Sequence, residues 1–275
     1  NLNITILDEN LVYRAGLLAE HGLSVLIEER GKRILFDTGQ SDAFMKNAAR
    51  LGVDLEGLDA IVLSHGHYDH CGGLRALETL ENLPPVYVRK NSFLKKYTAG
   101  RQPGDFRDIG IPWKRKDSRA EFIYTEDIQE IWPGFWLLGN IPYSPSGEEK
   151  PSGFFCQPEG TEEMAPDYFE DEQFLAVDSE EGLTLVMGCS HMGIINCLIH
   201  VRQYFPGRPI RCLLAGMHLM NASKERIWKT IQGLETFQIG CLIPVHCTGM
   251  EGIMAMKQAF QERCMIGQCG MKIRL

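Results

Sequence analysis

The segment 65–70, with the sequence HGHYDH, constrains this chain more than any other feature. It places three of the eight histidines and an aspartate within six residues, directly after the apolar run 60–63. Crowded imidazoles are costly to bury without partners, so packing explains the cluster poorly. Imidazole nitrogen and carboxylate oxygen are common ligands of catalytic zinc, which keeps one coordination position open for water. The sequence therefore predicts a metal site on a loop that leads from a strand into a helix.

The rest of the chain predicts an α/β fold. Apolar runs at 3–7, 24–28, 32–36, 60–63, 174–177, 183–187, 211–215 and 241–245 are typical of strands, with a hairpin turn at Arg30-Gly31. Helices are predicted from Ser41 as N-cap through Arg50, and over 74–80, 194–204, 223–237 and 252–263. Between about 84 and 170 the pattern weakens. We expect one domain over 1–275, with a cap or long loops in that region, because long irregular connections are usually functional or mobile.

Three further histidines each follow a predicted strand closely. His191 comes after the strand 183–187, His218 after 211–215, and His246 after 241–245. Proteins with α/β folds place their sites in the loops at strand ends. We therefore expect these three loops and the segment 65–70 to build one common centre.

Composition and charge narrow the functions that the chain can have. The formal net charge is −8 and the pI is near 5.5, whereas a broad nucleic-acid-binding surface needs clustered Lys and Arg. No apolar run approaches the roughly 18–20 residues that cross a bilayer, and the N-terminus lacks a signal-like pattern. The nine cysteines include no Cys-x-x-Cys pair, which favours buried thiols in a reducing compartment. We expect a soluble, cytoplasmic protein that binds neither nucleic acid nor membrane.

Together these features resemble the metallo-β-lactamase superfamily. The resemblance rests on the His-x-His-x-Asp-His motif, on the strand-terminal segment 37–39 (DTG), and on the strand-end His191 and His246. It covers nearly the whole chain. A narrower likeness, to the metal-dependent hydrolases and dihydropterin ribofuranosylaminobenzene phosphate synthases of that superfamily, rests on the segments 19–24, 188–196 and 246–249.

The resemblance implies an α/β fold, an αββα sandwich of two mixed sheets with outer helices, that holds two divalent metal ions. The implied ligands are, for one ion, His65, His67 and His191 and, for the second, Asp69, His70 and His246. Asp37 would orient the segment 65–70, the histidine loop, from behind the ligands. Zinc is the expected metal, and manganese and iron are alternatives, because the same ligands accept all three.

One position departs from the superfamily pattern. Many members have an aspartate that bridges the two metals where Gly188-Cys189 stands here. A cysteine thiolate is also a good ligand for zinc. Cys189 is therefore either a metal ligand or a bystander, and both interpretations stay open.

The resemblance implies hydrolysis through a hydroxide that bridges two metals about 3.5–4 Å apart, which also polarise the attacked group. Asp69 would bind one metal and help to orient the hydroxide. We expect a small anionic substrate, phosphorylated ones included, with an ester-like or phosphoester bond. The main alternative is a synthase that joins a pterin to an aminobenzene ribofuranoside phosphate. A metal-binding sensor or iron redox protein is a weaker alternative, because di-iron members usually have a glutamate where His67 stands. The oligomeric state stays open.

Other residues are candidates for substrate contact. His21 and His218 fall in motifs of the narrower group but match no ligand position, so substrate contact and plain packing are both open. The segment 95–119 carries eight basic residues against three acidic ones, with aromatic residues between them, and would either grip a phosphate or form a solvated surface. His200 lies within the predicted helix 194–204, which favours packing, and we assign it no role.

Overall fold

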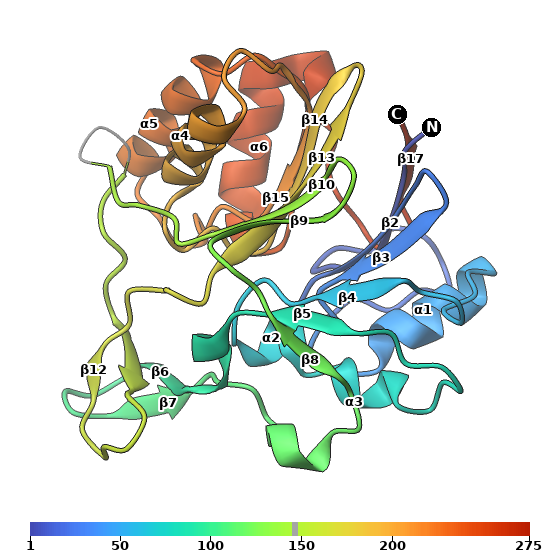
Figure 1. The fold of residues 1–275 in the computed structure, drawn as a ribbon. Coiled ribbons are helices and arrows are strands. Elements are labelled where there is room, and N and C mark those ends of the chain that lie inside the picture. Colours follow the sequence, from blue (N-terminus) through green and yellow to red (C-terminus); the bar gives the residue numbers. More distant parts are fainter. Residues whose placement is uncertain (145–147) are drawn as a thin grey trace. The chain divides into compact units, whose positions relative to one another are not determined.

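The computed structural model describes residues 1–144 and 148–275, and the chain divides into two compact units. The first unit comprises Asn1–Thr125, Ser152–Asp171 and Gln268–Leu275. The second unit comprises Glu126–Pro151 and Glu172–Gly267. Each of the three sheets of the structure lies within one unit (Figure 1).

The first unit is built on a mixed seven-stranded sheet. Its strands, in spatial order, are β17 (Lys272–Arg274), β1 (Asn3–Asp8), β2 (Ser24–Glu29), β3 (Lys32–Phe36), β4 (Ala60–Val62), β5 (Val86–Val88) and β8 (Phe122–Tyr124). The pairs from β17 to β3 are antiparallel, and those from β3 to β8 are parallel. This parallel half carries the histidine loop, which follows β4.

Three helices belong to the first unit: α1 (Ala43–Leu51), α2 (Tyr68–Cys71) and α3 (Leu74–Leu77). The helix α1 packs on β1, where Phe44 and Ala48 join Leu7, Leu26 and Leu35 in one buried core cluster. The apolar residues of α1 recur on one face of the helix, which explains why this segment is helical and why that face is buried.

The region 84–170 contains more regular structure than its sequence indicates. Besides β5 and β8 it holds a separate antiparallel sheet in the order β12 (Ala165–Pro166), β11 (Phe154–Gln157), β6 (Lys95–Ala99) and β7 (Phe106–Asp108). Two 3₁₀ turns, η1 (Lys90–Phe93) and η2 (Arg115–Asp117), also lie there. Residues 145–147, which fall in the predicted cap, lie outside the described residues. A single domain over 1–275, with a cap around 84–170, stays a prediction.

The second unit is built on a mixed six-stranded sheet. Its spatial order is β16 (Ile239–Pro244), β15 (Ile210–Ala215), β14 (Gly182–Met187), β13 (Gln173–Ser179), β10 (Phe135–Gly139) and β9 (Ile128–Trp132). The strands β14, β15 and β16 are parallel neighbours. The helices α4 (Ile194–Tyr204), α5 (Lys224–Glu235) and α6 (Gly249–Phe260) lie together along this sheet (Figure 1), and the turns η3 (His246–Thr248) and η4 (Gln261–Arg263) flank α6.

The predicted α/β fold class is confirmed, since the described residues form two mixed sheets with helices. The hairpin turns at Arg30 and Gly31, which have left-handed φ values of 50° and 74°. The prediction of Ser41 as N-cap was wrong by one residue, because Asp42 holds that position while the Ser41 hydroxyl accepts a hydrogen bond from the Ala43 N–H. Within 1–144 and 148–275, no helix is long and apolar enough to cross a membrane.

Three other helix predictions differ at their ends. The helix expected over 223–237 is α5, which begins after Ser223 as N-cap and ends at Glu235. The helix expected over 74–80 ends as α3 at Leu77. The last helix begins at Gly249, three residues before the predicted start, and ends at Phe260 because the next residue, Gln261, has a left-handed φ of 51°. Such shifts are common at helix ends, where tertiary contacts rather than periodicity decide the boundary.

Candidate metal centre

The histidine loop, residues 65–70, follows β4 and ends within α2, so that a buried strand fixes its start and a helical turn fixes its end. Gly66 is required here by space. A Cβ at this position would lie 2.0 Å from the Ser92 carbonyl oxygen, and Gly66 has no left-handed φ. The glycine therefore allows the backbone of η1 to approach the loop closely.

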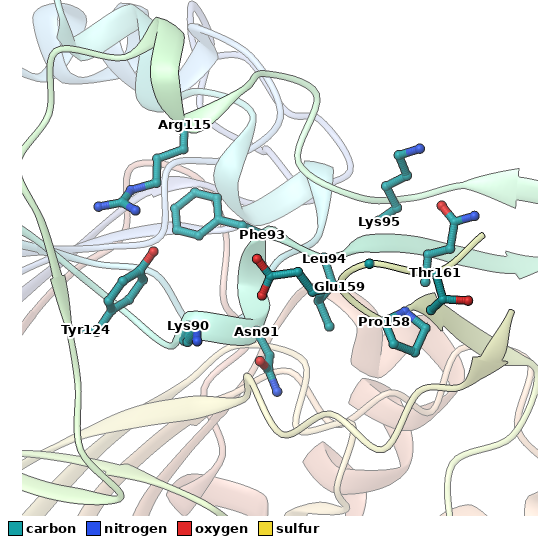
Figure 2. A pocket seen from close by; sticks show the side chains of 12 residues that line it. Lys90, Asn91, Phe93, Leu94, Lys95, Arg115, Tyr124, Pro158, Glu159 and Thr161 are labelled. Carbon is teal, nitrogen blue, oxygen red and sulfur yellow. The ribbon is translucent and has the colours of Figure 1, made fainter. Parts of the chain in front are cut away.

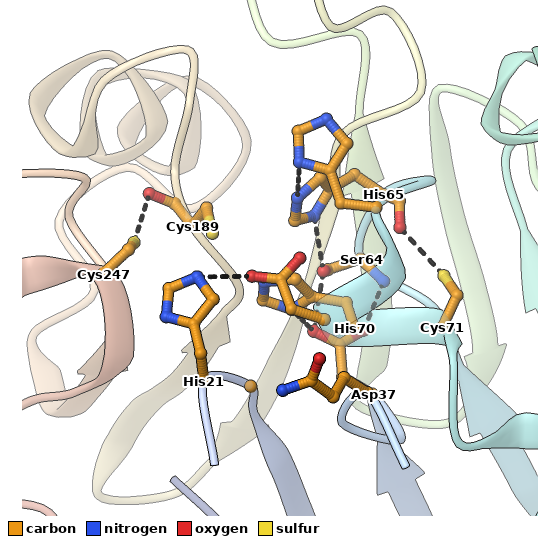
Figure 3. A network of polar contacts seen from close by, with 12 residues as sticks. His21, Asp37, Ser64, His65, His70, Cys71, Cys189 and Cys247 are labelled. Atoms are coloured by element: carbon orange, nitrogen blue, oxygen red, sulfur yellow. Dashed lines mark hydrogen bonds and ion pairs between the residues drawn. The ribbon is translucent and has the colours of Figure 1, made fainter. Parts of the chain in front are cut away.

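The structure brings the imidazoles of this loop into direct contact (Figure 3). His65 Nε2 lies 3.1 Å from His67 Nδ1, and the rings of His65 and His70 have centroids 4.4 Å apart. The Asp69 carboxylate lies 3.7 Å from His70 Nε2. Burial, and then the charges of His70 and His67, lower the pKa of His65 well below its usual value. His65 is therefore neutral near pH 7, the form in which imidazole binds metals.

Asp37 lies behind this loop with both carboxylate oxygens engaged. Its Oδ1 accepts a hydrogen bond from the Ser64 N–H at 2.7 Å, and its Oδ2 lies 2.7 Å from the Ser64 hydroxyl and 2.6 Å from His70 Nδ1. Asp37 is completely buried and has a left-handed φ of 58°. A carboxylate on Nδ1 fixes the orientation of the ring and directs Nε2 towards a metal. This geometry suits the predicted role of Asp37.

A buried ion cluster of Lys96, Asp167 and Asp171 also holds the histidine loop. No sequence pattern indicates this cluster. Lys96 Nζ lies 2.8 Å from Asp167 Oδ2 and 2.8 Å from Asp171 Oδ1. The second oxygen of Asp171 accepts a hydrogen bond of 2.7 Å from the Gly66 N–H. Burial alone would lower the pKa of Lys96, but the charges of Asp171 and Asp167 outweigh it and raise that pKa. Lys96 is therefore a buried structural cation and was wrongly counted in the basic surface of 95–119.

His21 lies beside a predicted ligand. Its Nε2 is 3.2 Å from Asp69 Oδ2, and its Nδ1 is 3.1 Å from the side-chain amide of Asn10. The imidazole is 42% exposed, so it joins a buried carboxylate to solvent. Figure 3 shows this contact as a dashed line. A role in substrate contact stays a prediction, and the geometry gives His21 a position from which a proton could reach Asp69.

The second unit gathers its candidate residues at one edge of its sheet. Because β14, β15 and β16 are parallel, the loops that follow them lie at the same edge. The ligand atoms of Cys189, His218 and Cys247, one from each loop, lie within 4.8 Å of one another. The rings of His191 and His218 have centroids 4.5 Å apart. Three of the predicted strand-end loops therefore meet within this unit.

The backbone of these loops is strained and closely packed. Ser190, His218 and His246 have left-handed φ values of 52°, 48° and 51°. Residues other than glycine rarely adopt this conformation, and they are enriched at functional sites. A Cβ on Gly216 would lie 2.3 Å from the Gly188 carbonyl oxygen, so only glycine allows the β14 and β15 loops to approach each other here.

Another buried carboxylate anchors the loop after β14. Glu172 accepts hydrogen bonds from the His191 N–H at 2.7 Å and the Met192 N–H at 3.0 Å. The side chain is almost fully buried. In the sequence, Glu172 ends a generally acidic stretch, and no local pattern separates it from the exposed Glu162, Glu163 and Glu170 of that stretch. Its role appears only when the fold brings it to the loop.

His200 and the basic segment 95–119 are the remaining residues that the sequence analysis singled out. His200 is buried and its Nε2 lies 3.0 Å from the Gly139 carbonyl oxygen, so it packs as expected. In the first unit, a hollow of about 390 Å³ is lined by Lys90, Lys95 and Arg115, among others (Figure 2). The Arg115 guanidinium lies 5.0 Å from the centroid of the Tyr124 ring. Lys95 and Arg115 belong to the basic segment 95–119, whose role in anion binding stays a prediction.

Imidazoles and carboxylates gathered at the ends of parallel strands are typical of α/β metalloenzymes. The family model described as the metallo-beta-lactamase superfamily matches residues 18–191. The chain belongs to this superfamily, as its sequence predicted.

Three relatives span nearly the whole chain. An uncharacterized protein of Methanocaldococcus jannaschii is 34% identical over 263 residues, which are 93% of this chain and 94% of the relative. The 7,8-dihydropterin-6-methyl-4-(beta-D-ribofuranosyl)-aminobenzene-5'-phosphate synthase of the same organism is 30% identical over 277 residues, 95% of this chain and 92% of the synthase. The crystal structure of Tm1679, a metal-dependent hydrolase of the beta-lactamase superfamily, is 34% identical with a TM-score of 0.87, covering 100% of this chain and 99% of that one.

Proposed function

We propose that the chain is a dinuclear metal-dependent hydrolase that cleaves an ester-like or phosphoester bond in a small anionic substrate. The observation that carries this proposal is the buried cluster of the histidine loop, with Asp37 on the far nitrogen of His70. Family membership and the similarity to a metal-dependent hydrolase support an enzyme. The reaction and its substrate belong to the proposal.

The donor set of the loop fits divalent metals. His65, His67, Asp69 and His70 supply imidazole nitrogens and a carboxylate oxygen, all buried. The proposal adds His191 and His246 from the second unit as the remaining ligands, following the superfamily pattern. When bound, two divalent ions would lower the pKa of a coordinated water towards neutrality and would stabilise negative charge on the substrate. Zinc is the first candidate, and manganese or iron would fit the same donors.

The side chains of this loop have distinct tasks in the proposed reaction. Asp37 holds the His70 ring in place, and the lowered pKa of His65 keeps this imidazole neutral. Asp69 binds a metal and orients the attacking water. His21, which touches Asp69 and is partly exposed, would carry a proton between the site and solvent or contact an anionic substrate. The proposed tasks of Asp69 and His21 depend on the contact of 3.2 Å between their side chains.

The test is a substrate panel. The metal-loaded protein is incubated with phosphodiesters, phosphomonoesters, lactones and thioesters, and both turnover and bound metal are measured. We expect turnover of one class and its loss, with loss of bound metal, in His67→Ala. The matched control is His200→Gln, which removes a buried histidine that packs on Gly139 and should keep both. Native protein that binds no metal in metal-supplemented buffer would contradict the proposal.

A synthase is the second candidate, favoured by the 30% identity to the dihydropterin ribofuranosylaminobenzene phosphate synthase. In that case the same metals would bind phosphate or activate a leaving group without delivering water. The discriminating assay offers a pterin pyrophosphate together with the aminobenzene nucleotide. Product from this pair, with no hydrolysis across the panel, would replace the hydrolase by the synthase.

A further inference from the structure

Three sulfur atoms gather on one face of β15 and β16 in the second unit. Cys212 and Cys241 lie directly opposite each other in the parallel register of these two strands. Neighbouring strands are about 4.8 Å apart, so residues in register present their side chains on the same face and in contact. The Cys241 Sγ also lies 3.6 Å from the Met265 Sδ. Two thiols and a thioether from three separate segments therefore form one cluster.

The segment that carries Met265 is fixed to the edge of this sheet. The strand β16 is an end strand, and the Met265 N–H donates a hydrogen bond of 2.9 Å to the Leu242 carbonyl oxygen. The Arg263 guanidinium donates another, of 3.0 Å, to the Ile239 carbonyl oxygen. A methionine side chain has three rotatable bonds and adapts readily to its neighbours. The backbone of Met265 is thus held beside β16, while its sulfur can adjust to a bound ion.

The two thiols of the cluster differ in exposure and acidity. Cys212 is completely buried, whereas Cys241 is partly exposed. The hydrogen bond with Cys212 lowers the pKa of Cys241, against the effect of burial. The same hydrogen bond, and then burial, raise the pKa of Cys212. Cys241 therefore ionises first and accepts a hydrogen bond from the Cys212 thiol, so a cation that reaches Cys241 from solvent would take the place of the shared proton.

We propose that Cys212, Cys241 and Met265 form a binding site for a soft monovalent metal ion of the copper(I) type. Thiolate and thioether sulfur select such ions, whereas hard cations such as magnesium and calcium prefer oxygen. A metal–sulfur bond of about 2.3 Å places two ligands of a three-coordinate ion roughly 4 Å apart, close to the observed contact of Cys241 and Met265. Binding releases the proton of each thiol that is still protonated.

This site does not depend on the proposed function. It uses none of the ligands proposed at 65–70, 191 and 246, and all three sulfur atoms belong to the second unit. A buried cysteine commonly serves only as a small apolar side chain. The partial exposure of Cys241 and its contact with two further sulfur atoms distinguish it from such a residue.

The experiment uses copper(I) alone as the probe, added without oxygen to the full chain after loading with zinc. Competition with a coloured copper(I) chelator measures the affinity of the native chain and of Cys241→Ser and Met265→Leu. The control variants are Cys156→Ser, which removes a partly exposed thiol on β11, and Cys197→Ser, which removes a buried thiol on α4. Circular dichroism checks that each variant folds.

We expect the native chain and both controls to bind one equivalent of copper(I) and to keep their zinc. Cys241→Ser should weaken copper binding roughly a hundredfold, because a hydroxyl replaces a thiolate, and Met265→Leu about tenfold, because it removes the thioether. Equal affinity of the native chain and Cys241→Ser overturns the inference. So does a loss of zinc that matches the copper taken up. A chain that binds no zinc contradicts the proposed function alone.

A second measurement decides the case even if Cys241→Ser does not fold. The chain is produced with selenomethionine, and X-ray absorption at the copper edge is recorded for the native sequence and for Met265→Leu. Scattering from selenium next to copper should be present in the native chain and absent in Met265→Leu. Copper without a selenium neighbour in the native chain, or with one that persists in Met265→Leu, overturns the site.

Discussion

The two units present their candidate ligands in different ways. In the first unit, four donors come from one stretch of six residues, 65–70, which follows β4 and runs into α2. In the second unit, the donors come from three loops, after β14, β15 and β16, that lie far apart in the sequence. A contiguous motif can be recognised in a sequence, whereas a set of single residues in separate loops becomes a cluster only when parallel strands bring their ends to one edge.

The two regions share one structural feature. A buried carboxylate accepts hydrogen bonds from the backbone of each ligand-bearing loop: Asp171 from Gly66 in the first unit, and Glu172 from His191 and Met192 in the second. The first region has in addition the carboxylate of Asp37 on an imidazole. The comparison indicates that carboxylates hold the backbone in both regions, and that the histidine loop has in addition a carboxylate on one of its rings.

The largest effect should come from Asp171→Ala. This substitution leaves buried Lys96 with one carboxylate and deprives the Gly66 N–H of its acceptor, so we expect the free energy of unfolding to fall by about 3–5 kcal/mol. Urea denaturation measures it. The control is Asp178→Ala, whose partly exposed pair with Arg208 should contribute no more than about 1 kcal/mol. Equal losses in both variants would show that charge does not hold the histidine loop.

The next effect separates the two regions by metal affinity. Asp37→Asn removes the charge that orients His70, and we expect metal affinity to fall about 10–100-fold. Glu172→Gln weakens hydrogen bonds to the backbone of the His191 loop and should lower metal affinity less than about tenfold. Competition with a chelator measures both. A larger loss in Glu172→Gln would reverse the comparison.

The smallest effect, when counted per pH unit, concerns the buried carboxyl group of Asp8. Burial, and then the charge of Glu20, raise the pKa of Asp8 to about 9 from its usual 3.8. Between these values the folded chain keeps a proton that the unfolded chain releases, so stability falls as pH rises, by at most about 1.4 kcal/mol per pH unit. Asp8→Asn removes this decline.

Unfolding of Asp8→Asn followed from pH 5 to pH 8 tests this sign. The variant should gain stability relative to the native chain with every step upward in pH. Asp42→Asn, at an exposed position on the same unit, should keep the native slope. A parallel pair of curves for the native chain and Asp8→Asn would show that Asp8 is ionised in the fold.

Much of the fold could be predicted because its signals are local. The strand and helix periods, the Arg30-Gly31 turn and the helix 194–204 all depend on residues near one another in the chain. The region 84–170 was harder, because its strands are as short as two to five residues and pair with distant partners. Short strands carry too few residues to display a period.

The sequence by itself determined the histidine loop and the strand-end histidines, since each is defined by residues that follow an apolar run. Only the tertiary structure decided what surrounds them. The Gly66–Asp171 hydrogen bond joins residues 105 positions apart, and the ion pair between Lys96 and Asp171 spans 75. Such partners are chosen by the path of the whole chain, because burying a charge is favourable only where the fold delivers its counterpart.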